Sequence, residues 1–159
     1  MDVQQSIRIA LDQIVDDAQM AGYDSDRPAS QIVIDQPVVP GDNQLTISHE
    51  YDDTTERTVT YLLSAGQVLK QVTFINAAGT PTPGPQEPLL GGAVSLRFTY
   101  GLDIDNDGVA DAWVPASGVG TARLVAIRVR LSARPTHPDF TNILSRELES
   151  IATLRNRLL

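Results

Sequence analysis

Residues 2–24, DVQQSIRIALDQIVDDAQMAGYD, decide the fold, because they carry the one clearly helical pattern of the chain. Apolar residues recur there at spacings of three and four, which places them on one face of a helix. Gly22 follows at a position where helices commonly end in a left-handed conformation. The pattern predicts an amphipathic helix over residues 2–22 that packs on a sheet with this apolar face. The residues of the face are Val3, Ile7, Ala10, Leu11, Ile14, Ala18 and Ala21.

Most of the remaining chain shows the period-two alternation of antiparallel strands with one buried face. Residues 44–51, 57–63 and 67–74 predict two hairpins, joined by an acidic turn and by Ser64-Ala65-Gly66. Further strands are predicted over residues 31–34, 94–100, 125–131 and 148–157, with a helical turn in 142–150 as an alternative to the start of the last one. In residues 94–100 the expected buried face is Val94, Leu96, Phe98 and Tyr100.

Length and composition favour a single globular domain over residues 1–159. Hydrophobic residues make up 42% of the chain, which is enough for a core. There is no cysteine, so disulfides and cysteine-based metal or redox sites are excluded. The formal net charge of −8 argues against a nucleic-acid partner, because phosphate neutralisation requires a basic surface. We therefore expect an α+β domain, an N-terminal helix on antiparallel sheet.

Two proline-containing stretches read as connections. Residues 77–88, AAGTPTPGPQEP, are excluded from a central strand by their prolines and predict an extended surface connection. A contact surface for a neighbouring subunit is the alternative. Residues 132–141 form a second predicted connection, which carries His137.

Four segments together resemble PilW-type minor pilins. QQSIRIALDQIVDDAQMAGYD resembles the part of the family's helix that follows its membrane-spanning segment, and VTYLLSAGQVLKQV (59–72) is similar to the family's central hairpin. LLGGAVSLRFTYGLDIDNDG (89–108) resembles its strand leading into an acidic loop, and ATLRNRLL (152–159) its ending. The matches occur in the family's order. The related GspJ-type minor pseudopilins of type II secretion share this plan and remain an alternative.

The resemblance implies a role in assembly rather than in catalysis. Minor pilins of this kind prime the polymerisation of a type IV pilus-like fibre, and their partners are other minor pilins or pseudopilins. It implies a location at the periplasmic face of the inner membrane and then in an extracellular pilus or a periplasmic pseudopilus. It also implies that partners bind through the helix and adjacent loops, for which the candidate residues are Val3, Ile7, Leu11 and Ile14.

Such proteins begin with a short basic leader and about twenty apolar residues that span the membrane. This sequence begins at Met1-Asp2 and contains no run of 18 apolar residues. If the resemblance holds, we expect a piece from which leader and anchor are missing, so that membrane attachment depends on a helix absent here. A cytoplasmic protein that begins at Met1 is the alternative.

Residues 103–111, DIDNDGVAD, carry the spacing of an EF-hand-type calcium loop. Oxygen ligands at positions one, three, five and nine, a glycine at six and a carbonyl at seven suit the six to eight oxygens that Ca²⁺ prefers. Position twelve is Val114, where a bidentate acid is normally found, so the site is incomplete or another segment completes it. The alternative is an acidic turn without a metal. The candidate Ca²⁺ ligands are Asp103, Asp105, Asp107, the carbonyl of Val109, and Asp111.

No catalytic motif supports an enzyme. The sequence has no G-x-S-x-G elbow and no phosphate-binding glycine loop, and its two histidines, His49 and His137, are expected to be ordinary surface or edge residues. Tyr51, Tyr61, Tyr100 and Trp113 are expected to pack in the core or across strands, with a sugar-stacking platform as the alternative. The second functional hypothesis is a calcium-dependent extracellular binding module of the adhesin or lectin type.

Overall fold

The computed structural model describes residues 2–24, 31–135 and 145–155, and within them it confirms the α+β class. One N-terminal helix packs on two antiparallel sheets. The elements are α1 (Val3–Gln19), β1 (Val38–Val39), β2 (Gln44–Asp52), β3 (Thr55–Ser64), β4 (Gln67–Asn76), β5 (Pro81–Gly91), β6 (Ala93–Asp103), β7 (Ala112–Val114), the 3-10 turn η1 (Ala116–Gly118), β8 (Arg123–Ala133) and β9 (Arg146–Thr153).

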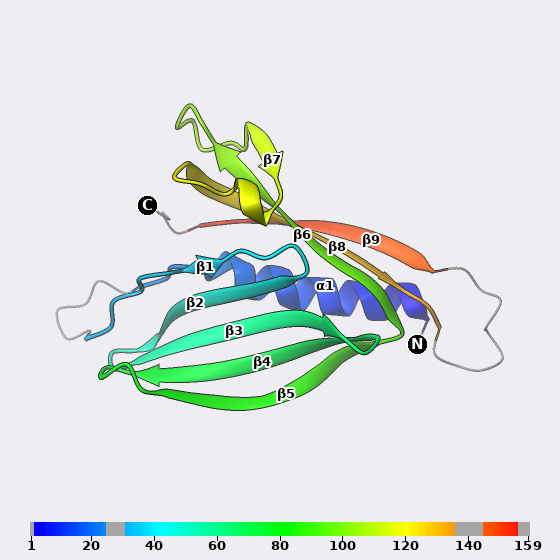
Figure 1. Ribbon diagram of the computed structural model, residues 1–159, viewed down its shortest axis with the longest axis horizontal. Coiled ribbons are helices and arrows are strands. Elements are labelled where there is room, and N and C mark those ends of the chain that lie inside the picture. Colours follow the sequence, from blue (N-terminus) through cyan, green and yellow to red (C-terminus); the bar gives the residue numbers. More distant parts are fainter. Residues whose placement is uncertain (1, 25–30, 136–144, 156–159) are drawn as a thin grey trace.

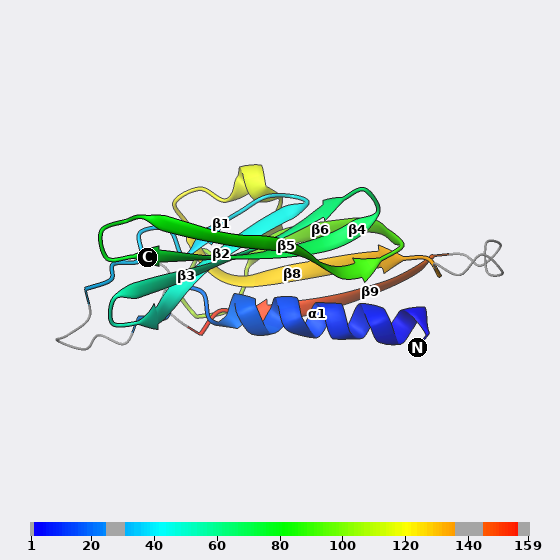
Figure 2. The ribbon, with the colours of Figure 1, turned by 90° about the horizontal axis from the view of Figure 1, so that it is seen from below.

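The strands form two separate sheets with simple topology. Sheet A has the order β1-β2-β3-β4-β5, and sheet B has the order β7-β6-β8-β9 (Figure 1). Neighbouring strands in both sheets are antiparallel, as predicted from the alternating patterns. Helix α1 lies along one side of the sheets, with its N-terminus at one end of the domain, and it packs chiefly on β8 and β9 (Figure 2).

Helix α1 begins with a side-chain cap and ends earlier than predicted. The Asp2 carboxylate accepts the N–H of Gln5 at 2.8 Å, which satisfies one of the free donors of the first turn. Gly22 has the expected positive φ of 76°, but the helix ends at Gln19. The N–H of Gly22 donates to the carbonyl of Ser48 in β2 at 2.9 Å. Pairing with sheet A therefore replaces the last helical turn.

The predicted apolar face of α1 is confirmed as the buried one. Val3 is half-buried and packs against the core. The fully buried residues of the helix are Ile7, Ala10, Leu11, Ile14 and Ala18.

A polar contact also attaches the C-terminal part of α1 to sheet A. The Asp17 carboxylate lies 3.4 Å from Arg57 Nη1 and 3.2 Å from Lys70 Nζ, and it accepts a hydrogen bond from the hydroxyl of Tyr61. Arg57 and Tyr61 belong to β3, and Lys70 belongs to β4. The helix is therefore fixed to both sheets, by apolar packing on sheet B and by this cluster on sheet A.

Both predicted hairpins of sheet A are present. In the turn between β2 and β3, the Asp52 carboxylate accepts the N–H of Thr54 at 2.9 Å. Between β3 and β4, Ala65 and Gly66 have φ values of 50° and 74°. Two consecutive left-handed residues are what a tight hairpin turn requires, because this turn matches the twist of the strands.

Three strand predictions are corrected. Val94 is 45% exposed, because the β6–β8 register shifts between Ala93 and Ser95 and turns Ala93 inward in its place. Residues 31–34 form no strand; the short strand lies later, at β1. The last strand covers Arg146–Thr153 rather than 148–157. The alternative, a helical turn in 142–150, is not seen in its described part, residues 145–150.

The proline-rich stretch is mostly a strand, which corrects its prediction as a connection. Residues 81–88 belong to β5, which forms one edge of sheet A. Prolines are tolerated there because an edge strand has an unpaired side. The register shifts near Gly84, where an added Cβ would lie 2.8 Å from the carbonyl oxygen of Val72. The stretch does not form a central strand, as predicted. Residues 81–88 nevertheless pair with β4, where a loop was expected.

The prediction of His49 as an ordinary surface or edge residue is wrong, since β2 lies between β1 and β3 and the side chain is buried. His49 is only 7% exposed, and its Nε2 lies 3.3 Å from Arg57 Nη1. The alternation of β2 directs this side chain into the core face of sheet A, beside the Asp17 cluster. His137 and most of the predicted connection 132–141 lie outside the described residues, whereas residues 132 and 133 still belong to β8.

The aromatic residues do not share one surface. Tyr61 and Tyr100 are fully buried, which confirms their prediction as core residues. Tyr51 is 60% exposed and contacts the ring of Phe74, with 4.9 Å between ring centroids. Trp113 lies under the guanidinium of Arg128, which is 4.0 Å from its ring centroid.

Candidate metal centre

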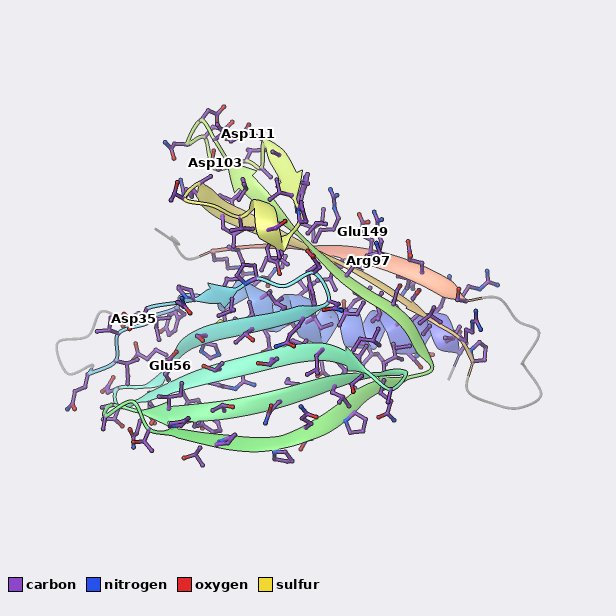
Figure 3. The ribbon with its side chains drawn as sticks, in the orientation of Figure 1. Asp35, Glu56, Arg97, Asp103, Asp111 and Glu149 are labelled. Atoms are coloured by element: carbon purple, nitrogen blue, oxygen red, sulfur yellow. The ribbon has the colours of Figure 1, made fainter. Side chains whose placement is uncertain are left out.

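The acidic loop connects two paired strands at one end of sheet B. β6 ends at Asp103 and β7 begins at Ala112, and the two strands pair through Gly101 with Trp113 and Leu102 with Ala112. The N–H of Asp111 donates to the carbonyl of Leu102 at 2.7 Å, which closes the loop. Figure 3 shows Asp103 and Asp111 at this end of the molecule. The pairing therefore brings the first and last acids of the sequence pattern together.

The loop's own N–H groups hold its four carboxylates. Asp103 accepts from Asp107 at 3.1 Å and from Gly108 at 2.9 Å. Asp111 accepts from Ile104 at 2.8 Å, and Asp107 accepts from Val109 at 2.8 Å. Asn106 and Gly108 have positive φ values of 62° and 85°, which turn the chain tightly enough for these bonds.

The four carboxylates can hold a metal ion. One oxygen from each of Asp103, Asp105, Asp107 and Asp111 lies within 4.8 Å of the others. Calcium binds oxygen at about 2.3–2.6 Å, so ligands on opposite sides of the ion are about 4.6–5.2 Å apart. Separations of up to 4.8 Å are within the span of two ligands of such an ion.

Burial and charge distinguish the carboxylates. Asp103 is only 2% exposed. Burial acts to raise the pKa of Asp103, but the N–H groups of Gly108 and Asp107 outweigh it, so this pKa lies below its ordinary value. The pKa of Asp105 is raised, first by desolvation and then by the neighbouring Asp107 and Asp111. A bound cation would offset the part of this rise that comes from the neighbouring carboxylates.

A cation that the sequence pattern did not reveal also lies at this loop. Arg123 Nη1 is 3.6 Å from Asp103 Oδ2, because Arg123 pairs with Asp103 at the start of β8. The Arg123 guanidinium already neutralises part of the negative charge of the loop. Its positive charge therefore opposes the binding of a metal cation there. No local signal indicates the contact, since the two residues are joined by strand register and not by spacing.

Val109 and Val114 occupy positions seven and twelve of the calcium pattern. Val109 lies in the loop, and its side chain is 63% exposed. Val114 belongs to β7 and packs against the core, so position twelve supplies no side-chain oxygen. A calcium ion here would need a further oxygen from another segment of the chain, from water or from an outside ligand.

A hollow opens beside the loop. Its lining includes Asp103 and Asn106 from the loop, Val38 from β1, Thr121 just before β8, and Arg123 at the start of β8. Apolar and polar groups therefore meet next to the carboxylates, where an external oxygen ligand would have access.

The four candidate partner residues of the helix are not on the free surface. Ile7 and Ile14 are fully buried, Leu11 is 3% exposed, and Val3 is half-buried. While α1 packs as described, these side chains contact the sheets of their own chain. The exposed side of the helix carries other residues, among them Ile9, Asp12 and Asp16.

No helix among the described residues is both long and apolar enough to cross a membrane.

The strands and the acidic loop lie in a region that matches a known protein family. A family model described as type IV pilus-assembly protein W matches residues 60–150, which extend from β3 into β9 and include the acidic loop. No curated protein matches the chain. The matched part is more than half of the 159 residues. The chain therefore belongs to the PilW family of type IV pilus-assembly proteins, which are generally not enzymes.

Proposed function

We propose that this domain is a minor pilin or pseudopilin that primes the assembly of a type IV pilus-like fibre together with other minor pilins. The observation that carries the proposal is the PilW match, together with an amphipathic helix fixed along one side of the domain. The domain contributes binding surfaces and no chemical turnover.

The position of α1 supports this role. The helix begins at one end of the domain, so an apolar segment continuing it in the N-terminal direction would leave the domain there (Figure 2). Apolar packing and the Asp17 cluster fix the direction of that exit. A rigid exit direction would let a fibre orient the domain. The proposed location is the periplasmic face of the inner membrane before assembly, and then a pilus or pseudopilus.

Deletion of the gene and complementation test the role. Cells without the gene should lose surface fibres, and the full-length wild-type gene should restore them, as counted by electron microscopy. A complementing gene with Leu11→Asp, which places a charge in the helix–sheet packing, should not restore fibres. The control Ala77→Asp, which places the same charge at an exposed site in the β4–β5 turn, should restore them. Unchanged fibre and pseudopilus assembly in the deletion strain would overturn the proposal.

Partner binding is a separate test. Titration calorimetry with the domains of minor pilins from the same organism should detect weak association, because the apolar anchor supplies much of the packing in such fibres. The domain alone should be largely monomeric at micromolar concentration.

The acidic loop adds a calcium site to this proposal. The 4.8 Å spacing of the four carboxylates and their backbone hydrogen bonds support Ca²⁺, with Asp103, Asp105, Asp107, Asp111 and the carbonyl of Val109 as ligands. The absence of an acid at Val114 and the presence of Arg123 predict weak binding, with Kd of ~10⁻⁴–10⁻³ M. The bound ion would fix the β6–β7 turn.

A calcium-dependent binding module is the second candidate, favoured by the hollow that shares Asp103 and Asn106 with the loop. A glycan array probed with and without 2 mM Ca²⁺ separates the two. Glycan binding that requires calcium, with no affinity for any pilin domain, would support the adhesin function.

A further inference from the structure

His49 is a buried titratable side chain of β2, and it lies where the end of α1 meets sheet A. Its two neighbours in the chain hold the segment that follows the helix. The N–H of Gly22 donates to the carbonyl of Ser48 at 2.9 Å. The N–H of Glu50 donates to the carbonyl of Tyr23 at 2.8 Å. His49 is therefore at the centre of the connection between the helix and this sheet.

The contacts of the imidazole ring fix its protonation state. Nδ1 lies 2.9 Å from the carbonyl oxygen of Glu50, and Nε2 lies 3.3 Å from Arg57 Nη1. A carbonyl oxygen only accepts a hydrogen bond and a guanidinium only donates one, so Nδ1 carries the proton and Nε2 carries the lone pair. Both hydrogen bonds therefore require the neutral imidazole in one tautomer.

The same nitrogen of Arg57 also binds the helix. Nη1 lies 3.4 Å from Asp17 Oδ1, and its two N–H groups can donate to the imidazole and to the carboxylate at the same time. A proton on Nε2 of His49 would remove the acceptor and place a second positive charge against the guanidinium. Arg57 would then move away from His49, and its ion pair with Asp17 would be disturbed.

We propose that His49 is a pH-sensitive switch, which holds the end of α1 on sheet A while it is neutral and releases it when it is protonated. Imidazole side chains change charge between about pH 5 and 8, so the contact is complete at the upper end of that range and is lost toward the lower end. The release is local, because α1 packs on sheet B through buried apolar side chains that do not titrate, among them Ile7 and Ile14.

The charged groups on the helix side of His49 act in both directions. The Asp17 carboxylate attracts a protonated imidazole, but it already has ion pairs with Arg57 and Lys70 and accepts a hydrogen bond from Tyr61. Lys70 on β4 and Arg57 on β3 both oppose a further positive charge. Arg57 contacts the ring directly, so its repulsion outweighs the attraction of a carboxylate that lies behind it.

Glu56, next to Arg57 on β3, is an acid that can respond in the same pH range. Burial is the largest cause that raises the pKa of Glu56, and Asp35 adds to the rise, whereas the Ser48 side chain and the charge of His49 act to lower it. Figure 3 shows Asp35 and Glu56 at the same end of the domain. A test of His49 must therefore separate its protonation from that of Glu56. The segments that meet at His49 also carry Glu50, Tyr23 and Asp24.

The switch goes beyond the proposed function, since it follows from the fold whatever the domain assembles with. Its consequence for a fibre does rest on the pilus role. Contacts of Asp17 fix the direction in which α1 leaves the domain. Acid would loosen that direction and so weaken the orientation of the domain in the fibre.

Nuclear magnetic resonance tests the protonation state of the ring. The chain has two histidines, so His49 is the single one in a His137→Gln background. At pH ~8 the nitrogen-15 shifts should show a proton on Nδ1 and none on Nε2. A proton on Nε2, or rapid exchange between the two tautomers, would overturn the inference.

Hydrogen exchange tests the release of the helix end. Between pH ~8 and ~5 the protection factors of the Gly22 and Glu50 amides, corrected for the intrinsic exchange rate at each pH, should fall about tenfold. The amides of β8, which lies between β6 and β9, should keep their protection. His49→Gln offers Arg57 a neutral acceptor at every pH, so this variant should keep the protection of Gly22 in acid. The matched control Glu56→Gln should lose it as the wild type does.

Three outcomes of hydrogen exchange would overturn the inference. The first is an equal loss of protection in His49→Gln and the wild type. The second is a loss that disappears in Glu56→Gln, because Glu56 would then be the responding group. The third is an equal loss on β8, which would show global unfolding. The wild-type and tautomer measurements need no substitution of His49, and no measurement here involves a fibre. Their failure would therefore leave the pilus role standing, and failed complementation of fibres would leave the switch standing.

Discussion

The hydroxyl of Tyr61 on β3 donates a hydrogen bond to the carboxylate of Asp17 near the end of α1. The same carboxylate forms ion pairs with Arg57 Nη1 at 3.4 Å and with Lys70 Nζ at 3.2 Å. One acidic side chain of the helix thus binds three side chains of sheet A. Because α1 packs mainly on sheet B, this contact ties the two sheets together through the helix.

Replacing Asp17 should therefore destabilise the domain. Asp17→Ala leaves Arg57, Lys70 and the Tyr61 hydroxyl without their common acceptor, and we expect a loss of about 1–3 kcal/mol in the free energy of unfolding. Urea denaturation measures it. The matched control is Asp16→Ala, one residue earlier on the exposed side, which should change stability by less than about 0.5 kcal/mol. Equal effects of the two variants would show that the cluster contributes nothing.

Tyr61 predicts a loss of stability at alkaline pH. Burial, the hydrogen bond to Asp17 and the charge of Asp17 raise the pKa of Tyr61 above its ordinary value of 10.0. Because the pKa is higher in the folded than in the unfolded state, the protonated Tyr61 stabilises the fold fully below pH ~10. This contribution to the free energy of unfolding is lost as pH rises toward the pKa of the folded state. Tyr61→Phe should be less stable than wild type at pH 7 but lose less stability between pH 9 and 11. The exposed Tyr51→Phe should follow the wild-type profile.

Leu11 tests the buried face of the helix. Leu11→Ala should cost about 2–5 kcal/mol, because the side chain is 3% exposed and its removal leaves a cavity. Ile9→Ala, on the exposed side of α1, is the control and should cost far less. A loss below about 0.5 kcal/mol for Leu11→Ala in chemical denaturation would contradict the packing of α1 described above.

Calcium should raise the melting temperature of the wild type, since a ligand that binds only the folded state stabilises it by mass action. The shift should grow through the millimolar range, and Mg²⁺ should substitute poorly because it requires a tighter octahedral shell. Asp105→Ala should abolish the shift, whereas Asp12→Ala, with the same change of charge on α1, should retain it. An unchanged melting curve and no heat of binding in calorimetry would leave the loop as an acidic turn.

Arg123→Gln should strengthen calcium binding by several fold, because it removes the cation 3.6 Å from Asp103 Oδ2. Calorimetric Kd values of the two proteins measure the effect. Weaker binding in this variant would show that Arg123 supports the loop rather than competing with the ion.

Gly101 should be intolerant of a side chain. An added Cβ would lie 2.9 Å from Ala110 Cβ and 3.1 Å from the ring of Trp113, so Gly101→Ala must displace the segment that closes the acidic loop. We expect a loss of about 1–3 kcal/mol and a lower calcium affinity. Gly120→Ala is the control, since nothing lies within 4 Å of its added Cβ. Equal stability of the two variants would contradict the close packing of Trp113 on β6.

The sequence by itself determined the features that depend on local spacing. The 3.6-residue period of Ile7, Leu11 and Ile14 identified the helix and its buried face, and Ala65-Gly66 identified a hairpin turn. The alternation in β8 identified a strand with one buried face. The D-x-D-x-D-G spacing brought three carboxylates together, because a tight turn aims alternate side chains inward.

Only the tertiary structure decided what depends on strand register and on contacts between distant segments. Pairing turned the proline-rich stretch into the edge strand β5, and a bulge exposed Val94. Register also placed Arg123 on Asp103 and Arg97 opposite Arg130. Helix α1 ends at Gln19, and the amide of Gly22 donates to the carbonyl of Ser48 on β2 instead of continuing the helix. Local spacing carries no information on these contacts, since each joins residues whose separation along the chain has no fixed relation to their distance in space.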